Sequence, residues 1–345
     1  MPSLSTTLDR VESLSTGQAS VPYSPRATTV DLRCPFCSTD NFGFLYSSLA
    51  QEQTPIACRG CSSVLFQERG IWNALPPDRQ RYFSRFIKDY EYVRSAEGRG
   101  SSDAEFYWAL PYTDVTGRNS WQWSIRCRTY AYLENRILPH LSRGANQPLA
   151  ILDLGAGNGW LSYRLARLGH RPIAVDLLTN ELDGLGAAAH YQVALPEFFP
   201  RFRAELDRLP FAGGQFDCAI FNASFHYSEN YKRTLAEAIR CLCPGGTIII
   251  ADSPSYVREV SGQQMKKERE ELFQKRFGFR SDGLMSGEYL TKERLIALEA
   301  QHDLLWQTHH VWHGLRWACR PLLAKWGNRR EPSQFRIYTA RVKVS

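Results

Sequence analysis

The chain has 345 residues, of which 43% are hydrophobic and 22% charged, so a mostly disordered chain is excluded. No apolar run approaches the ~18 residues of a membrane-spanning helix, and we expect no integral membrane association. The net charge of +7 is concentrated at one end. Residues 304–345 hold eight lysines or arginines and one glutamate, which leaves the preceding residues neutral.

Residues 1–29 contain eleven serines or threonines and few apolar residues, which predicts a disordered leader. Asp9 and Glu12 interrupt this segment, and it does not resemble a secretory signal. The chain has nine cysteines, an odd number, and four of them lie at close spacing. A reducing compartment fits this usage better than a disulfide framework, and we expect a cytoplasmic protein.

Two Cys-x-x-Cys pairs indicate a zinc ribbon over residues 30–75. Cys34 and Cys37 form the first pair, Cys58 and Cys61 form the second, and twenty residues separate the pairs. Four thiolates at this spacing can close a tetrahedron around one structural Zn²⁺ ion. A short segment with few large apolar residues also needs such a cross-link to fold.

Residues 76–147 are expected to form a helical cap or linker, with helices over 79–94 and 124–140. Between these helices lies an aromatic stretch, 106–123, which contains Phe106, Tyr107, Trp108, Tyr112, Trp121 and Trp123. Two interpretations of this stretch are open. It forms either an aromatic wall for a flat or greasy ligand, or a hydrophobic seam between the N-terminal module and the next domain.

From residue 148 onward, strands alternate with helices. We expect strands over 148–155, 171–177, 201–206, 215–222, 247–252, 303–312 and 335–344, and helices over 158–169, 231–242 and 291–300. The residues 243–246, Cys-Pro-Gly-Gly, are expected to close the helix before the fifth strand. This alternation predicts an α/β domain over 148–345 with a mostly parallel sheet, interrupted by insertions at 253–290 and 313–334.

The strongest chemical signal is the glycine-rich segment at 153–159, DLGAGNG, between the first strand and the following helix. Gly155 and Gly157 allow a tight turn and a close approach of the backbone to a ligand. Asp176 ends the next strand, where a carboxylate can accept hydrogen bonds from both hydroxyls of a ribose. The third glycine comes too early for a dinucleotide-binding G-x-G-x-x-G pattern. The segment therefore indicates an adenosine-containing cofactor.

The sequence LDLGAGNGWLSYRLARLG, followed by AVD, resembles motif I and the next acidic residue of class I S-adenosylmethionine-dependent methyltransferases. AELDRLPFAGGQFDCAIFNASFHY and CLCPGGTIIIAD resemble later segments of the ubiquinone and menaquinone methyltransferase group, whose domain is type 11. The resemblance covers about residues 148–252. It implies a Rossmann-like sheet with an antiparallel last strand, preceded here by the zinc ribbon and the helical cap.

The resemblance also implies the cofactor, S-adenosyl-L-methionine, and the residues that bind it. These are Asp153, Gly155, Ala156, Gly157, Asn158, Gly159, Asp176, Leu177, Glu205, Leu206 and Asn222. Asp153 and the 155–159 loop would surround the methionine moiety, and Asp176 would bind the ribose. Glu205 would lie near the adenine amino group, with Asp207 as the alternative. A second interpretation of Asp153 is an acid that fixes the loop.

His226 and its neighbour Tyr227 are the catalytic candidates, because they follow the fourth strand where this family places residues between cofactor and substrate. His226 would act as a general base, or it would pack over the cofactor. The methyl sulfonium is already activated, so orientation of the acceptor can supply most of the catalysis. The fourth strand ends in Asn222-Ala223-Ser224-Phe225, unlike the Pro-Pro motif of enzymes that methylate planar amines. We therefore expect an enzyme with a small-molecule or lipid-linked acceptor.

Two alternatives remain. A zinc ribbon before a class I domain resembles bacterial ribosomal RNA guanine-N1 methyltransferases, in which the ribbon helps to recognise RNA. The basic, tryptophan-containing segment 313–334 suits RNA, a membrane interface, or a short helix packed on the domain. The ribbon itself lies in a neutral part of the chain, which disfavours RNA. The other alternative is a non-catalytic protein that binds the cofactor and docks a protein partner through the ribbon.

Overall fold

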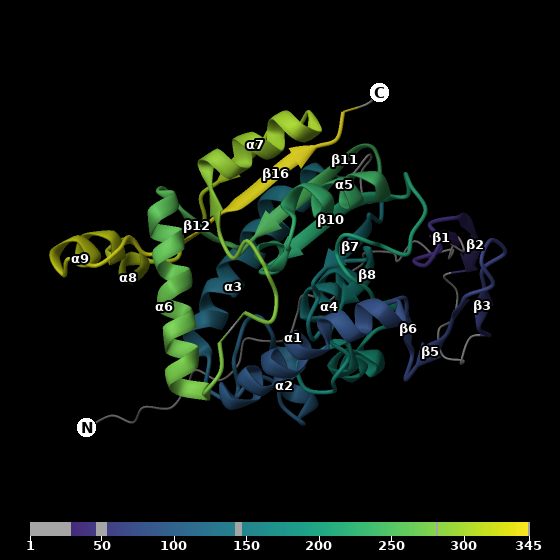
Figure 1. The fold of residues 1–345 in the computed structure, drawn as a ribbon, viewed down its shortest axis with the longest axis horizontal. Coiled ribbons are helices and arrows are strands. Elements are labelled where there is room, and N and C mark those ends of the chain that lie inside the picture. The colour runs from purple at the N-terminus through teal and green to yellow at the C-terminus, as the bar shows by residue number, and fades with distance from the viewer. Residues whose placement is uncertain (1–28, 46–53, 142–146, 281, 344–345) are drawn as a thin grey trace, which may run out of the picture.

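The computed structural model describes residues 29–45, 54–141, 147–280 and 282–343 (Figure 1). The predicted leader, apart from Thr29, lies outside these ranges. None of the helices within them is long and apolar enough to cross a membrane.

Nine strands of the described residues form the main sheet. They are β5 (Gln67–Glu68), β6 (Ile71–Asn73), β7 (Ala150–Leu154), β8 (Arg171–Asp176), β9 (Arg201–Arg203), β10 (Phe216–Asn222), β11 (Leu242–Ala251), β14 (Gln307–His309) and β16 (Ile337–Arg341). Their order is β14-β16-β11-β10-β7-β8-β9-β6-β5. Strands β6 to β11 run parallel, whereas β16 is antiparallel to both β11 and β14. This arrangement confirms the predicted Rossmann-like sheet with an antiparallel last strand.

The central strands are buried on both faces because helices cover each side of the sheet, and this explains their continuous apolar sequences. On one face, α5 (Tyr231–Cys241) and α7 (Lys292–His302) contribute Leu235 and Leu295 to one core cluster. On the other face, α4 (Trp160–Arg167) and the 3-10 segment η3 (Leu185–Ala194) contribute Leu161 and Leu185 to a second cluster.

The helical cap consists of α1 (Pro77–Ala96), α2 (Ala104–Ala109) and α3 (Ser120–Tyr132). The helix predicted over 124–140 begins four residues earlier, at Ser120. It continues as a π-helical turn, η1 (Leu133–Ile137), and then as a 3-10 turn, η2 (Leu138–His140). Pro139 has no N–H to donate, which explains why regular helix is not maintained through this region.

The cysteine-containing module consists of two antiparallel hairpins, β1 (Thr29–Arg33) with β2 (Asp40–Leu45) and β3 (Ile56–Ala57) with β4 (Val64–Leu65). The chain then enters the main sheet, because β6 pairs in parallel with β9. Trp72 of β6 is fully buried and stacks on Phe202 with ring centroids 6.3 Å apart. The end of the segment predicted as a separate ribbon is therefore part of the domain's own sheet.

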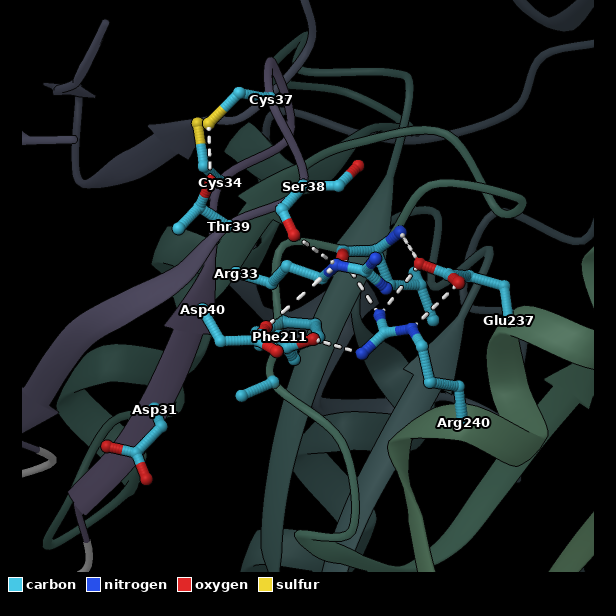
Figure 2. Close-up of polar contacts among 12 residues, drawn as sticks. Asp31, Arg33, Cys34, Cys37, Ser38, Thr39, Asp40, Phe211, Glu237 and Arg240 are labelled. Atoms are coloured by element: carbon cyan, nitrogen blue, oxygen red, sulfur yellow. Dashed lines mark hydrogen bonds and ion pairs between the residues drawn. The ribbon is translucent and has the colours of Figure 1, made fainter. Parts of the chain in front are cut away.

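A second contact joins the first hairpin to the loop before β10. The side chain of Gln215 bonds both main-chain groups of Asp31, donating to its carbonyl at 2.9 Å and accepting from its amide at 2.7 Å. Figure 2 shows Arg240 of α5 beside this loop, where its guanidinium donates to the Phe211 carbonyl at 2.6 Å. Because side chains and backbone both contribute, the hairpin is fixed in orientation relative to the sheet.

The two predicted insertions meet in space. The first contains β12 (Pro254–Tyr256), α6 (Glu259–Phe277) and β13 (Leu290–Thr291), and the second contains α8 (Leu315–Ala318), α9 (Arg320–Trp326) and β15 (Gln334–Phe335). Strands β13, β12 and β15 form a small three-stranded sheet that joins the insertions. Figure 1 shows α8 and α9 projecting beside α6, at the opposite end of the molecule's long axis from β1 to β4.

Candidate functional site

A cavity of about 630 Å³ lies where the parallel strands end. Residues that directly follow β7, β8 and β10 form one wall, and α1, α3, α6, α8 and α9 contribute to the others. Eight of the predicted cofactor residues line it: Gly155, Ala156, Gly157, Asn158, Asp176, Leu177, Leu206 and Asn222. The carboxyl edge of a parallel sheet is where ligands bind in this type of fold.

The glycine turn after β7 brings three strand ends together. The amides of Gly155 and Ala156 both donate to the Val175 carbonyl on β8, at 2.8 and 3.0 Å. Gly155 has a φ of +77°, and a Cβ atom there would lie 2.2 Å from the Cβ atom of Ser224, which follows β10. A side chain at this position would therefore be strained and would also collide with the neighbouring strand end.

Asp176 is the acidic group of this wall. One carboxylate oxygen accepts from the Gly157 amide and the other from the Leu178 amide, each at 2.8 Å. Burial raises the pKa of Asp176, whereas these backbone donors lower it. Each oxygen keeps a free lone pair, so this carboxylate can accept two further hydrogen bonds from a ligand in the cavity.

Asp153, Gly159 and Glu205 lie outside the cavity wall. Asp153 is buried and accepts from the Ser162 amide at 3.1 Å and the Ser162 hydroxyl at 2.8 Å, which fixes α4 under the glycine turn. Burial raises the pKa of Asp153 to about 7. The Glu205 carboxylate instead forms an ion pair with Arg79 at 2.8 Å. Direct cofactor contact by these three residues stays a prediction, and the geometry of Asp153 favours a positioning role.

The other proposed acid near the adenine, Asp207, is also engaged elsewhere. Its carboxylate forms an ion pair with Arg233 of α5 at 3.1 Å. Leu206, between the two acids, is the residue of this segment that faces the cavity.

The sequence pattern did not reveal a group of arginines that α1, the turn after it and α3 bring to the cavity. Arg94 pairs with Asp183, with Nη2 and Oδ1 3.0 Å apart, and Arg99 pairs with Glu97 at 3.1 Å. Arg126 forms no hydrogen bond or ion pair with another described residue, and its guanidinium lies over the Trp123 ring. Burial and the nearby Arg94 and Arg99 lower the pKa of Arg126 to about 10. The cavity thus contains a guanidinium that has no anionic partner among the described residues.

His226 and Tyr227 lie on a short 3-10 turn, η4 (Phe225–Tyr227), and both line the cavity. The Nδ1 atom of His226 is 3.3 Å from the Ser253 hydroxyl. Burial, together with Arg269 and Arg126, lowers the pKa of His226 to about 3, which makes it neutral but weakly basic at neutral pH. The Tyr227 ring packs edge-on against the Tyr90 ring, with centroids 5.7 Å apart.

The aromatic stretch at 106–123 is mostly a seam. Tyr107 donates its hydroxyl to the Leu182 carbonyl at 2.7 Å, and Trp108 donates to the His190 carbonyl at 2.8 Å. Trp123 packs edge-on against Trp160 at the start of α4. Of the six aromatic residues in this stretch, Trp121 is the one that lines the cavity.

The insertions supply the wall opposite the glycine turn. Arg269 and Phe273 of α6 line the cavity, together with Trp317 of α8 and Arg320 of α9. The Arg320 guanidinium lies 3.4 Å from the centroid of the Trp317 ring, which in turn stacks on Phe335. This wall is therefore both aromatic and cationic.

Residues 152–250 match a family model described as a methyltransferase domain. This segment belongs to the methyltransferase domain family. The match confirms the family resemblance that the motifs predicted, and the sheet order agrees with it.

Similar curated proteins match the methyltransferase domain over part of their length. The malonyl-[acyl-carrier protein] O-methyltransferase of Buchnera aphidicola is 26% identical over 106 residues, 30% of this chain and 39% of the relative. The tRNA U34 carboxymethyltransferase of Alcanivorax borkumensis is 29% identical over 134 residues, 39% of this chain and 37% of the relative. The chain thus spans about two fifths of these relatives' length.

Among solved structures, the 1,6-didemethyltoxoflavin-N1-methyltransferase of Burkholderia thailandensis, with 1,6-didemethyltoxoflavin and S-adenosylhomocysteine bound, is similar. It is 17% identical, with a TM-score of 0.45, and the alignment covers 84% of this chain and all of that chain.

Away from the cavity of the methyltransferase domain, the four predicted metal ligands form a cluster. The sulfur atoms of Cys34, Cys37, Cys58 and Cys61 all lie within 4.8 Å of one another. Cys34 and Cys61 are separated by 3.7 Å, and Cys37 and Cys58 by 3.6 Å, between Sγ atoms. A tetrahedron with Zn–S bonds of ~2.3 Å has edges of about 3.8 Å. The cluster therefore has the dimensions of a four-cysteine zinc site.

The two cysteine turns share one hydrogen-bonding pattern. In the first, the Phe36 amide donates to the Cys34 sulfur at 3.4 Å, and in the second, the Gly60 amide donates to the Cys58 sulfur at 3.3 Å. Burial raises the pKa of Cys34 to about 12, whereas a hydrogen bond from Thr39 lowers the pKa of Cys37 to about 6. Backbone donors of this kind stabilise thiolates, which are the form that binds a metal.

Proposed function

We propose that this protein transfers a methyl group from S-adenosylmethionine to a small-molecule or lipid-linked acceptor. The observation that carries the proposal is the cavity itself. On one side the glycine turn and the Asp176 carboxylate face it, and on the other side lies the aromatic and cationic wall of the insertions. Methyl transfer requires the donor and the acceptor to be held close together, so one cavity must offer a binding surface for each of them.

The cofactor, when bound, supplies an electrophilic methyl group. The 155–158 turn would surround its methionine moiety, Asp176 would accept the ribose hydroxyls, and Leu177 would lie beside the adenine. Asp153 would keep the turn in place through Ser162. Arg126 would pair with the methionine carboxylate, because this guanidinium has no anion of its own among the described residues.

The remaining residues would orient the acceptor and exclude water. The rings of Tyr90 and Tyr227 pack together at the cavity wall, and Trp121 adds a further aromatic surface. His226 is neutral at neutral pH and able to accept a proton, but its lowered pKa makes it a weak base. This supports an acceptor that is already nucleophilic, with His226 as a hydrogen-bonding partner.

The structure also bears on the RNA alternative. The ribbon hairpins and the basic α8–α9 segment lie at opposite ends of the long axis (Figure 1). They are not arranged as one continuous surface for an RNA ligand. A cavity of about 630 Å³ would admit an RNA base only if that base were flipped out of its stack. Both observations support a small or lipid-linked acceptor over RNA.

The deciding experiment is methyl transfer from radiolabelled S-adenosylmethionine in a cell extract, followed by separation of RNA, protein, lipid and small molecules. Label in the lipid or small-molecule fraction is the expected result, and the Asp176→Ala variant defines the background. Label confined to RNA would establish the alternative acceptor. If S-adenosylhomocysteine binds but no fraction is labelled, the non-catalytic alternative would replace this proposal.

We further propose that Cys34, Cys37, Cys58 and Cys61 hold one structural Zn²⁺ ion. The hairpin contacts with Gln215 and the pairing of β6 with β9 support a structural role, because the module is joined to the methyltransferase domain at two places. Metal analysis of the purified protein should find about one zinc per chain. A Cys58→Ser variant should lose the zinc and unfold at a lower temperature. Metal-free wild-type protein with unchanged melting would contradict the proposal.

A further inference from the structure

The short helices α8 and α9 have two different faces. Trp317 and Arg320 point inward to the cavity, and Trp317 stacks on Phe335 with ring centroids 5.3 Å apart. His313, before α8, is buried, and its carbonyl accepts a hydrogen bond from Arg128 of α3. The inner face is therefore held against the body of the protein.

The outer face is apolar and exposed. Trp326 is 82% exposed, Leu315 74% and Trp312 64%, and Leu322 and Leu323 are also exposed. Two tryptophans and three leucines within fifteen residues thus contact only solvent over most of their surface. A soluble surface seldom gathers so much apolar area in one place unless that area contacts a partner.

Cations alternate with these apolar side chains along the sequence. Segment 313–334 contains five lysines or arginines and one acid, Glu331. Lys325 and Arg329 are exposed and form no ion pair with another described residue, whereas the Arg316 guanidinium lies over the Trp121 ring of α3. The positive charge of the outer face is therefore free to meet a negatively charged partner.

We propose that the outer face of α8 and α9 docks on an anionic lipid surface. Tryptophan and leucine insert at the boundary between headgroups and acyl chains, and lysine and arginine pair with anionic headgroups. Nucleic acid would satisfy the cations, but it would leave the leucine side chains in water. The two faces share the same short helices, so docking would hold helices that line the cavity at the lipid surface. This proposal does not depend on methyl transfer.

The test is sedimentation of the full chain with vesicles. One set contains phosphatidylcholine alone, and the other also contains about one third phosphatidylglycerol. We expect at least about tenfold more binding to the anionic vesicles, and weaker binding as salt increases. Equal binding to both sets, or none, would overturn the proposal.

Two variants locate the contact. Leu322→Ser/Leu323→Ser/Trp326→Ser should abolish vesicle binding, and Lys325→Glu/Arg329→Glu should weaken it about tenfold. All five side chains are exposed, so the fold should be retained, which circular dichroism will check. Val193→Ser is the matched control, because Val193 is an exposed apolar residue elsewhere, and it should bind like the wild type.

The same variants distinguish two other partners, a second copy of this chain and RNA. If the apolar variant converts a dimer to a monomer in gel filtration without a change in vesicle binding, the face joins two copies and the lipid proposal fails. Tighter binding to single-stranded RNA than to anionic vesicles, lost in Lys325→Glu/Arg329→Glu, would likewise overturn it.

Discussion

The two walls of the cavity are built in different ways. The wall that faces the proposed cofactor is made of strand ends and the turns that follow them, and Asp176 supplies its carboxylate. The opposite wall is made of side chains from helices far apart in sequence, such as Trp121 of α3 and Arg320 of α9. The sheet fixes the backbone of the first wall, whereas single substitutions can change the side chains that form the second. Donor binding and acceptor choice should therefore be separable by mutation.

The largest expected effect is the loss of cofactor binding in Asp176→Ala. This variant removes two charge-assisted hydrogen bonds to the ribose, and we expect affinity for S-adenosylhomocysteine to fall about 100-fold. Isothermal titration calorimetry measures this change directly. Asp176→Asn keeps one acceptor oxygen and should be intermediate. An affinity within twofold of the wild type would remove the proposed ribose site.

A smaller loss, about tenfold, is expected for Arg126→Gln, because one ion pair to the methionine carboxylate is removed. The affinity for 5′-methylthioadenosine, which has no carboxylate, should not change. Arg136→Gln is the matched control, since Arg136 is exposed on the continuation of the same helix. Equal weakening of both ligands would show that Arg126 supports the fold of the cavity instead.

A substitution in the acceptor wall should lower methyl transfer and leave cofactor affinity nearly unchanged. Phe273→Ala on α6 should leave S-adenosylhomocysteine affinity within twofold but lower methyl transfer to the identified acceptor, about fivefold in kcat/KM. The expected loss comes from apolar contact with the acceptor alone. A parallel loss of cofactor affinity would break the distinction between the two walls.

The Asp153→Ala variant tests whether Asp153 positions the glycine turn without contacting the cofactor. In Asp153→Ala the Ser162 amide and hydroxyl lose their buried acceptor, and the free energy of unfolding should fall by about 1–3 kcal/mol in urea titrations. Cofactor affinity should fall less than in Asp176→Ala. A loss of affinity without a loss of stability would instead indicate direct contact between Asp153 and the cofactor.

The smallest effect on turnover is expected for His226→Gln, with a rate within about threefold of the wild type. The folded pKa of about 3 lies below the ordinary value of 6.5, so the neutral form is favoured by folding. Its contribution to stability is full above pH 6.5 and is lost as the pH falls towards 3. Wild-type stability should therefore fall more steeply than that of His226→Gln between pH 6.5 and 5. A group with pKa near 6.5 in the rate profile, absent from the variant, would restore the general-base role.

The same contrast explains what could be predicted from sequence. Strands β7, β8 and β10 are mostly apolar runs; glycine follows the first, Asp176 ends the second and Asn222 ends the third, so their positions and the turn at 155–159 were predictable. One boundary was wrong: β11 begins at Leu242 and includes residues 243–246, which were expected to close a helix. Residues 216 and 242 pair across a bulge, and this long-range contact overrides the local turn preference.

The cavity residues that lie on helices could not be predicted in the same way. Arg126 and Trp121 lie on an amphipathic helix, and a helix pattern shows which face is buried but not what it faces. Trp121 and Trp123 are two positions apart, yet the first lines the cavity and the second packs in the seam. The joining of the two insertions through β12 and β15 likewise depends on pairing across more than seventy residues, which a single sequence does not record.

The pairing of β6 with β9 has a consequence for any attempt to dissect the protein. The sequence suggests a cut between the cysteine module and the methyltransferase domain, but that cut would run through a shared sheet. A fragment that begins after β6 would carry β9 as a bare edge and would uncover the apolar surface that Trp72 now covers. Unprotected edges of this kind recruit other chains, so the shortened protein should aggregate. In the intact protein, β6 at the end of the cysteine-containing module covers this edge and so protects the domain from aggregation.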